Sequence, residues 1–159
     1  FFAKSFLDNI SRGAFLTVKA GDALNTMTIG WALMGRAWRR PVLLVMVRES
    51  RHTHGLMQKA EDFTVSLPTT DMKEALEVCG STSGRDADKF RKANIKIKDA
   101  RKVSTPIIDS DGFHFECRIV HKSPMAPETL AGEYGEKIYP QGDFHTLFFG
   151  EIVDCYEIE

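Results

Sequence analysis

Apolar and polar residues alternate along several short segments of the chain, and this spacing predicts strands. The clearest alternation covers 113–119, where every second residue is apolar and those between are polar or charged. A similar pattern over 63–67 stops at Pro68, which ends a strand because proline has no backbone N–H to donate. Further strands are predicted at 15–19, 24–34, 42–48 and 147–156, with the first two joined as a hairpin.

Other segments place their apolar residues at helical spacing. They lie at 53–60, 72–79 and 86–93. Asp71 and Glu74 have the spacing of a capping box at the start of the second of these, and Gly80 is a fitting helix stop. The segment 124–143 is rich in proline and glycine, which predicts a long loop, and long loops in compact domains often carry function.

The order of these elements predicts the fold class. Strands outnumber helices, and the two do not alternate as they do in a doubly wound sheet. We therefore expect a mainly β fold with short helices, built as an antiparallel barrel. The 159 residues contain no repeat and no linker, so we expect one domain over 1–159.

Charge and hydropathy exclude several classes of partner. The formal net charge is -1, so the chain as a whole does not attract nucleic acid or an anionic membrane. The longest uninterrupted apolar run, Val42 to Val47, is six residues and far too short to span a bilayer. The chain begins with Phe1 rather than Met, so an absent signal peptide cannot be judged from it.

The cysteines predict packing rather than metal or disulfide chemistry. Cys79, Cys117 and Cys155 are odd in number and widely spaced, and no Cys-x-x-Cys occurs. We expect all three to be core or near-core thiols, with no metal site, and we expect a reducing cytoplasm as the location.

The first candidate for chemistry is the run 25–31. Asn25, Thr26 and Thr28 offer amide and hydroxyl groups next to the apolar Met27. A flat heteroaromatic with polar edges needs this mixture of groups. The alternative is a half-exposed strand with β-branched residues on its wet face.

The second candidate is Ser50, Arg51, His52, Thr53 and His54, which follow a buried strand and precede a helix. Free N–H groups at a helix start, a guanidinium fork and hydroxyls together suit a phosphate. The alternative is a capped helix with a solvated arginine. Two histidines without a third ligand are weak evidence for a metal.

The third candidate is the run of small residues from Cys79 to Asp86, which includes Ser81 and Ser83 and is followed by Lys89. Small residues let a ligand approach the backbone, and the lysine supplies a cation. The alternative is a plain helix–helix connection with serine caps. It is neither a Walker loop nor a dinucleotide fingerprint, because the required glycine and lysine spacings are missing.

In their order and spacing, these stretches resemble the flavin-reductase-like FMN-binding split-barrel family, and especially its flavoredoxin-type branch. The resemblance extends over about residues 13 to 156. The matching stretches are 25–31, 41–47, 50–56, 63–68, 83–90 and 147–153.

The resemblance implies a six-stranded antiparallel Greek-key split barrel and a homodimer with FMN, or alternatively FAD, near the subunit interface. It places the flavin edge on the first run, the phosphate on the second and a closing segment on the third. The residues it implies for cofactor binding are Asn25, Thr26, Met27, Thr28, Ser50, Arg51, His52, Thr53, Cys79, Ser81, Ser83 and Lys89. Gly30-Trp31-Ala32 departs from the small or hydroxyl residues of many members.

The resemblance favours an NAD(P)H-dependent flavin reductase in which hydride passes to the isoalloxazine N5. The flavin carries this chemistry, so no residue of the chain is named as catalytic. The alternatives are an electron carrier with tightly bound FMN and a protein redox partner, or a sensing or storage domain. Arg36, Trp38, Arg39 and Arg40 could steer an anionic nicotinamide dinucleotide or form a solvated turn.

Overall fold

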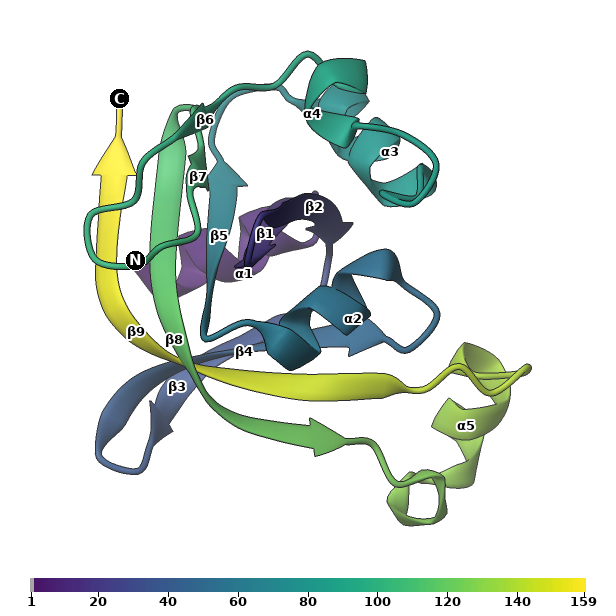
Figure 1. Ribbon diagram of the computed structural model, residues 1–159. Coiled ribbons are helices and arrows are strands. Elements are labelled where there is room, and N and C mark those ends of the chain that lie inside the picture. Colours follow the sequence, from purple (N-terminus) through teal and green to yellow (C-terminus); the bar gives the residue numbers. More distant parts are fainter. Residues whose placement is uncertain (1) are drawn as a thin grey trace.

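The computed structural model describes residues 2–159, with side chains described from Lys4 onward. Most of this chain lies in strands, and short helices connect them (Figure 1). The elements in chain order are α1 (Phe2–Ile10), β1 (Ala14–Ala20), β2 (Ala23–Ile29), β3 (Ala32–Ala37), β4 (Arg40–Arg48), α2 (His52–Lys59), β5 (Asp62–Pro68), α3 (Lys73–Ser81), α4 (Lys89–Lys92), β6 (Ile97–Lys98), β7 (Ile107–Ile108), β8 (Gly112–Pro124), the 3-10 turn η1 (Pro127–Thr129), α5 (Gly132–Ile138) and β9 (His145–Ile158).

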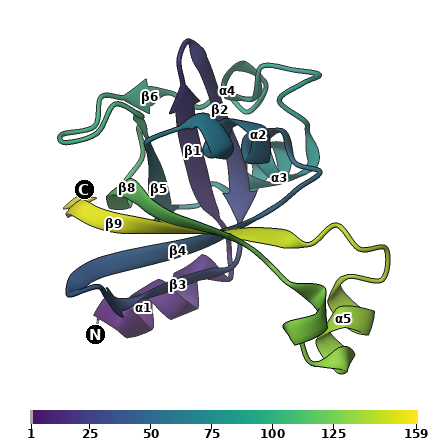
Figure 2. The same ribbon diagram turned by 60° about the horizontal axis from the view of Figure 1, so that its bottom comes forward.

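Seven strands form one antiparallel sheet in the order β2-β1-β5-β8-β9-β4-β3. The long strands β8 and β9 run through the whole molecule and carry register shifts at Glu116/Cys117 and Ile119/His121, which bend the pair. The sheet curls into a barrel at one end and continues as a flatter layer of β9, β4 and β3 (Figure 2). The mainly β, antiparallel expectation is confirmed.

The expected count of six strands is wrong. The described chain holds seven strands in the sheet and a separate two-stranded pair, β6 with β7. The predicted single strand 24–34 divides at Gly30 and Trp31 into β2 and β3, which occupy the two opposite ends of the sheet order. Each has a strand neighbour on one side only, so the barrel is split and β2 keeps an open edge.

Two apolar clusters hold these layers together. The larger fills the barrel and includes Leu16, Val45, Phe63, Phe115 and Phe148. The smaller lies on the other face of β1, where side chains of α3 pack on it, because successive strand residues point to opposite faces. Its members are Phe15, Ala75, Leu76, Cys79, Ile95 and Ile108.

Helix α1 was not predicted from the pattern. Phe6 and Ile10, one turn apart, face the barrel core, and the Phe6 ring meets Phe115 edge-on at 5.7 Å. None of the helices among residues 2–159 has the length and apolar character that crossing a bilayer requires.

Several predicted boundaries are wrong for local reasons. The Asp71 carboxylate accepts a hydrogen bond from the Lys73 N–H at 3.0 Å, and Asp71 and Glu74 do not form the predicted capping box. Helix α3 continues through Gly80 to Ser81. The helix expected over 86–93 is a single turn, α4, which Asp88 caps by accepting from the Arg91 N–H.

The segment 124–143 is more ordered than the expected loop. It contains η1 and α5 and projects from the end of the β8–β9 pair (Figures 1 and 2). The cysteine expectation also needs one correction. Cys79 and Cys117 are buried, but Cys155 is exposed, because β4 pairs with β9 only as far as Glu151 and leaves the rest of β9 at an edge.

Candidate functional site

The structure brings together the three runs of residues singled out in the sequence. Strand β2, the turn from β4 into α2, and the connection from α3 to α4 enclose a hollow of about 170 Å³, which we call the cationic hollow. Its lining residues are Met27, Ser50, Arg51, His52, Thr53, Cys79, Ser81, Thr82, Ser83, Gly84, Arg85 and Lys89.

The charged side chains that line this hollow are all positive. Its lining supplies three cationic side chains, Arg51, Arg85 and Lys89, together with five serine or threonine residues and no Asp or Glu. A chain with a net charge of -1 has therefore concentrated positive charge at one place. Hydroxyls beside cations are the groups that bind phosphate oxygens.

Lys89 is the most unusual of these cations. Its side chain is only 5% exposed, and its Nζ donates to the backbone carbonyl of Cys79 at 2.8 Å. No ion pair to Lys89 forms among residues 4–159. Burial lowers the pKa of Lys89, the Cys79 thiol partly offsets this, and Arg51 lowers it further. A buried cation without a carboxylate is a ready partner for an anion.

The pKa values of two neighbouring side chains are also shifted, mainly by burial. Burial, Arg85 and Lys89 lower the pKa of His52, in that order of importance. Burial raises the pKa of the Cys79 thiol to about 11, so this cysteine is a packed thiol rather than a thiolate. His54 faces away and hydrogen-bonds Thr146 Oγ1 at 2.9 Å, so the two histidines do not share a ligand.

The cationic hollow is held by a tie between β2 and α2. Asn25 Nδ2 donates to Thr53 Oγ1 at 2.8 Å, and both residues are buried. Gly84 lies directly against this pair. A Cβ at Gly84 would stand 2.3 Å from Asn25 Oδ1 and 2.8 Å from His52 Cδ2, so only glycine fits. Gly84 is a site residue that the prediction did not single out.

The threonines of β2 have structural roles. Thr26 Oγ1 donates to the Leu16 carbonyl at 3.2 Å and lies 3.1 Å from Thr17 Oγ1, away from the cationic hollow. Thr28 Oγ1 donates to the Leu76 carbonyl at 2.6 Å and so fixes α3 to β2. Of the four residues predicted on this strand, Met27 alone lines the cationic hollow.

Ser50 is already engaged within the protein. Its backbone N–H and Oγ donate to the Asp143 carboxylate at 2.9 and 2.7 Å, and Arg85 Nη1 donates to its carbonyl at 3.1 Å. Burial raises the pKa of Asp143, but the bonds from Ser50 and the charges of Arg48 and Arg51 outweigh this and lower it overall. Asp143 therefore ties the segment before β9 to the turn between β4 and α2 at Ser50.

A second hollow of about 190 Å³ adjoins the first and shares Met27 and Arg51 with it. Its residues come from the end of β2, from β4 and from the start of β9. They are Met27, Thr28, Ile29, Gly30, Trp31, Met46, Arg48, Arg51 and His145. The Trp31 and His145 rings lie 5.4 Å apart, and Trp31 is 47% exposed. We call this the aromatic hollow.

Arg48 and His145 were missed by sequence reasoning. Arg48 ends a buried strand and His145 begins another, and neither position has a motif around it. Only the pairing of Arg48 with His145 in the β4–β9 register brings them together. Among residues 2–159, no three His, Cys, Asp or Glu side chains gather as a metal site would require.

Fold and site together define a split-barrel protein with a cationic hollow beside an open strand edge. The chain belongs to the flavin reductase like domain family, whose sequence model matches residues 9–159. The suspected family is thereby confirmed.

The chain is also similar to individual proteins of this fold. An uncharacterized protein of Archaeoglobus fulgidus is 29% identical over 139 residues, which are 87% of this chain and 68% of that protein. The FMN-binding protein of Thermus thermophilus, solved with bound 1-cyclohex-2-enone, superposes with a TM-score of 0.71 at 24% identity over 91% of this chain and 69% of that one. The flavoredoxin of Methanosarcina acetivorans gives 0.71 at 24% identity, over 92% and 68%. This chain thus spans about two thirds of each.

Proposed function

We propose that this chain binds FMN, with the phosphate in the cationic hollow. The observation that carries the proposal is the composition of that hollow, whose lining holds three cations and five hydroxyl residues but no Asp or Glu, and in which one of the cations, Lys89, is buried. The volume of about 170 Å³ is below the roughly 300–1,000 Å³ of sites for drug-sized ligands, which fits the phosphate end of the cofactor rather than all of it.

The flavin ring system would extend from there along β2 into the aromatic hollow. The open edge of β2 leaves backbone N–H and C=O groups without a strand partner, and these suit the polar edge of an isoalloxazine. Met27, Ile29 and Trp31 offer apolar and aromatic surface beside that edge. The two hollows share Met27 and Arg51, so one elongated molecule can occupy both.

Each predicted residue then has a specific part. Ser50, Arg51, Thr53, Ser81, Ser83 and Lys89 would hold the phosphate, His52 would donate to it, and Cys79 would pack beneath. Asn25 and Thr28 would act by positioning α2 and α3, and Thr26 by joining β2 to β1. To bind the ligand, the Ser50 hydroxyl must exchange its bond to Asp143 for one to the phosphate. Otherwise Ser50 would act through Arg85, whose Nη1 donates to the Ser50 carbonyl.

The reaction we propose is that of an NAD(P)H-dependent flavin reductase, with residues 1–159 acting as one flavin-binding domain. When bound, the flavin supplies the redox chemistry by accepting a hydride at N5. The chain's own residues bind and orient it and surround it with positive charge. The family description favours this activity, and the likeness to a flavoredoxin favours the second candidate, an electron carrier with a protein partner.

We also propose a homodimer, although the eleven phenylalanines, many for a small barrel to bury, do not argue for it. From Phe6 onward, no phenylalanine is among the exposed large apolar residues, so the barrel buries its own. Three of the exposed large apolar side chains, Trp31, Leu33 and Trp38, lie instead on or beside the edge strand β3. An apolar edge strand is a surface that a second copy can cover.

Calorimetry with FMN and with riboflavin tests the cofactor and its orientation. We expect one FMN per chain and weaker riboflavin binding, since riboflavin lacks the phosphate. Equal affinities would contradict the phosphate seat. Anaerobic titration with NADH and NADPH then separates the two functions, because a reductase bleaches its flavin absorbance with one of them and a carrier with neither. Sedimentation of the FMN complex at micromolar concentration tests the homodimer, which a monomer would contradict.

A further inference from the structure

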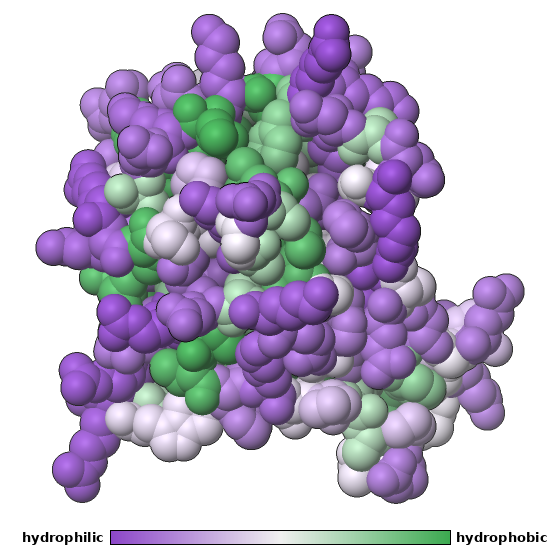
Figure 3. Space-filling model, viewed as in Figure 1, coloured by the Kyte–Doolittle hydropathy of each residue, from purple (hydrophilic) through white to green (hydrophobic). Residues whose placement is uncertain are grey.

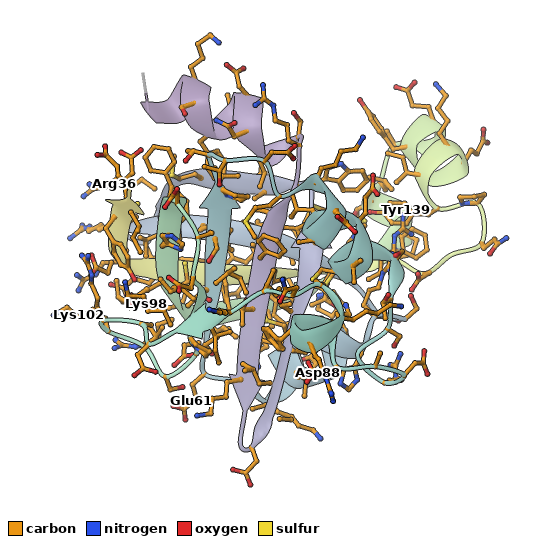
Figure 4. All side chains as sticks on the ribbon, turned by 90° about the horizontal axis from the view of Figure 1, so that it is seen from above. Arg36, Glu61, Asp88, Lys98, Lys102 and Tyr139 are labelled. Carbon is orange, nitrogen blue, oxygen red and sulfur yellow. The ribbon has the colours of Figure 1, made fainter. Side chains whose placement is uncertain are left out.

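A buried Tyr–His pair borders the aromatic hollow. The Tyr139 hydroxyl and His145 Nδ1 lie 2.6 Å apart, and the two residues are 6% and 7% exposed. Tyr139 ends the α5 segment, on the side of that segment that faces the rest of the molecule (Figure 4). His145 is the first residue of β9 and lines the aromatic hollow. The pair therefore joins the projecting segment to the site.

The direction of this hydrogen bond follows from the partners available. Among residues 4–159, the Tyr139 hydroxyl has no other hydrogen-bond acceptor, so a buried O–H must donate to His145 Nδ1. Burial and then the Arg48 charge lower the pKa of His145 to about 4, although Asp143 opposes this, so the imidazole is neutral near pH 7. A neutral ring that accepts at Nδ1 carries its proton on Nε2.

The pair is held rigidly. Arg48 donates from Nη1 to the Asp143 carbonyl at 3.0 Å and from Nη2 to the Ile138 carbonyl at 3.1 Å. Its guanidinium also lies 4.9 Å from the centre of the Tyr139 ring, which stacks on Phe144 at 4.7 Å. The Trp31 ring lies 5.4 Å from the imidazole. A donor fixed in this way loses little freedom when it meets an acceptor.

We propose that Tyr139 sets His145 as a hydrogen-bond donor, through its Nε2–H, to an acceptor atom of the flavin ring system in the aromatic hollow. The inference rests on the proposed binding of FMN. His145 is the contacting residue, and Tyr139 is a positioning residue that acts through it. Because reduction adds electron density to the ring acceptors, this donor binds the reduced cofactor more tightly than the oxidised one and raises the reduction potential.

The first test uses the protein without cofactor. Nitrogen-15 spectra of the histidine rings report which nitrogen carries the proton, and we expect His145 in the Nε2–H form. Tyr139→Phe removes the bond at Nδ1 and should give a mixture of the two tautomers. A wild-type His145 protonated at Nδ1 would overturn the proposal, since Nε2 would then be an acceptor.

The second test measures the potential of bound FMN together with the affinity for oxidised FMN. His145→Phe should weaken binding of reduced relative to oxidised FMN about tenfold, which lowers a two-electron potential by about 30 mV. His145→Gln, which can place an N–H near the position of Nε2, should recover most of this. Tyr139→Phe should give a smaller shift in the same direction.

His121→Phe is the matched control, because His121 is exposed beside Trp38 and Phe149 and lines neither hollow. Its potential should equal that of the wild type. If His145→Phe weakens both redox states equally, or leaves the potential unchanged, His145 is a packing residue and the inference is wrong. If the wild type binds no FMN at all, it is the proposed function that has failed, and the tautomer measurement still decides the geometry of the pair.

Discussion

The cationic hollow and the aromatic hollow lie next to one another but are built in different ways. The cationic hollow is polar, and most of its residues come from short runs that are continuous in the sequence, 50–53 and 79–85. The aromatic hollow draws its side chains from β2, β4 and β9, which are distant in the chain. The face of the molecule drawn in Figure 3 is mostly hydrophilic around smaller apolar patches.

The difference indicates a division of labour. Loops and helix starts expose backbone N–H groups and small side chains, so a contiguous run can make an anion seat by itself. A ring-binding surface needs rigid side chains in fixed orientations, and packed strands provide these. We therefore expect changes in the cationic hollow to alter affinity in a phosphate-dependent way and changes in the aromatic hollow to alter the properties of the ring.

The largest expected effect is that of Lys89→Met. Removing the buried cation should cost about 3 kcal/mol of FMN binding, roughly a hundredfold in affinity, because its charge-assisted bond is shielded from water. Riboflavin affinity should change little. Calorimetry with both ligands checks this, with Lys96→Met as the control for an exposed lysine. An equal loss for riboflavin would mean that Lys89 contacts the ring end, and the comparison of the two hollows would fail.

The second prediction concerns acid stability and the aromatic hollow. In the unfolded chain His145 takes up a proton near pH 6.5, whereas in the folded chain its pKa is about 4. The unfolded state thus binds more protons between these values, and folding stability falls as the pH is lowered from 6.5 to 4. We expect a loss of about 2 kcal/mol from this residue. Urea unfolding of wild type and His145→Gln against pH measures it, and identical slopes would refute the assignment.

The third prediction uses the close approach of Gly84 to Asn25. Gly84→Ala places a Cβ into Asn25 and His52, which should cost about 1.5 kcal/mol of stability as the loop shifts. The affinity for FMN should fall as well, because Gly84 lines the cationic hollow. The matched control is Gly135→Ala in α5, where a Cβ meets nothing within 4 Å. Thermal unfolding compares the two, and an unchanged Gly84→Ala variant would show that the loop does not need this packing.

The smallest effect is expected for Arg51→Ala. Arg51 lines both hollows but is exposed, and its guanidinium donates only to the Gly80 carbonyl at 3.3 Å among the described residues. Solvent screening should limit the loss of FMN affinity to about 1 kcal/mol. Titration with FMN and riboflavin sharpens the comparison, because a loss confined to FMN assigns Arg51 to the phosphate, and an equal loss with both ligands assigns it to the ring.

Much of the strand framework could be predicted because it depends on how apolar and polar residues alternate over a few positions. The alternation over 113–119 and the apolar run 42–48 correspond to β8 and β4. The break at Gly30 and Trp31 could not be predicted in the same way, since residues 24–34 all suit a strand and only the closure of the barrel sends β3 to the far edge. Helix lengths were misjudged where tertiary contacts decided them, as where α3, bonded to β2 through Thr28 and Leu76, continues past Gly80 to Ser81.

By itself, the sequence determined the mainly β class, the three runs that meet at the cationic hollow, and the family they resemble. These properties depend on residue type and on spacing over a few positions. The tertiary structure alone decided that Lys89 is buried without a carboxylate, that Thr26 faces away from the hollow, and that Tyr139 bonds His145 beside Arg48. Burial, hydrogen-bond direction and pKa depend on neighbours from other strands, and those neighbours are set only when the sheet closes.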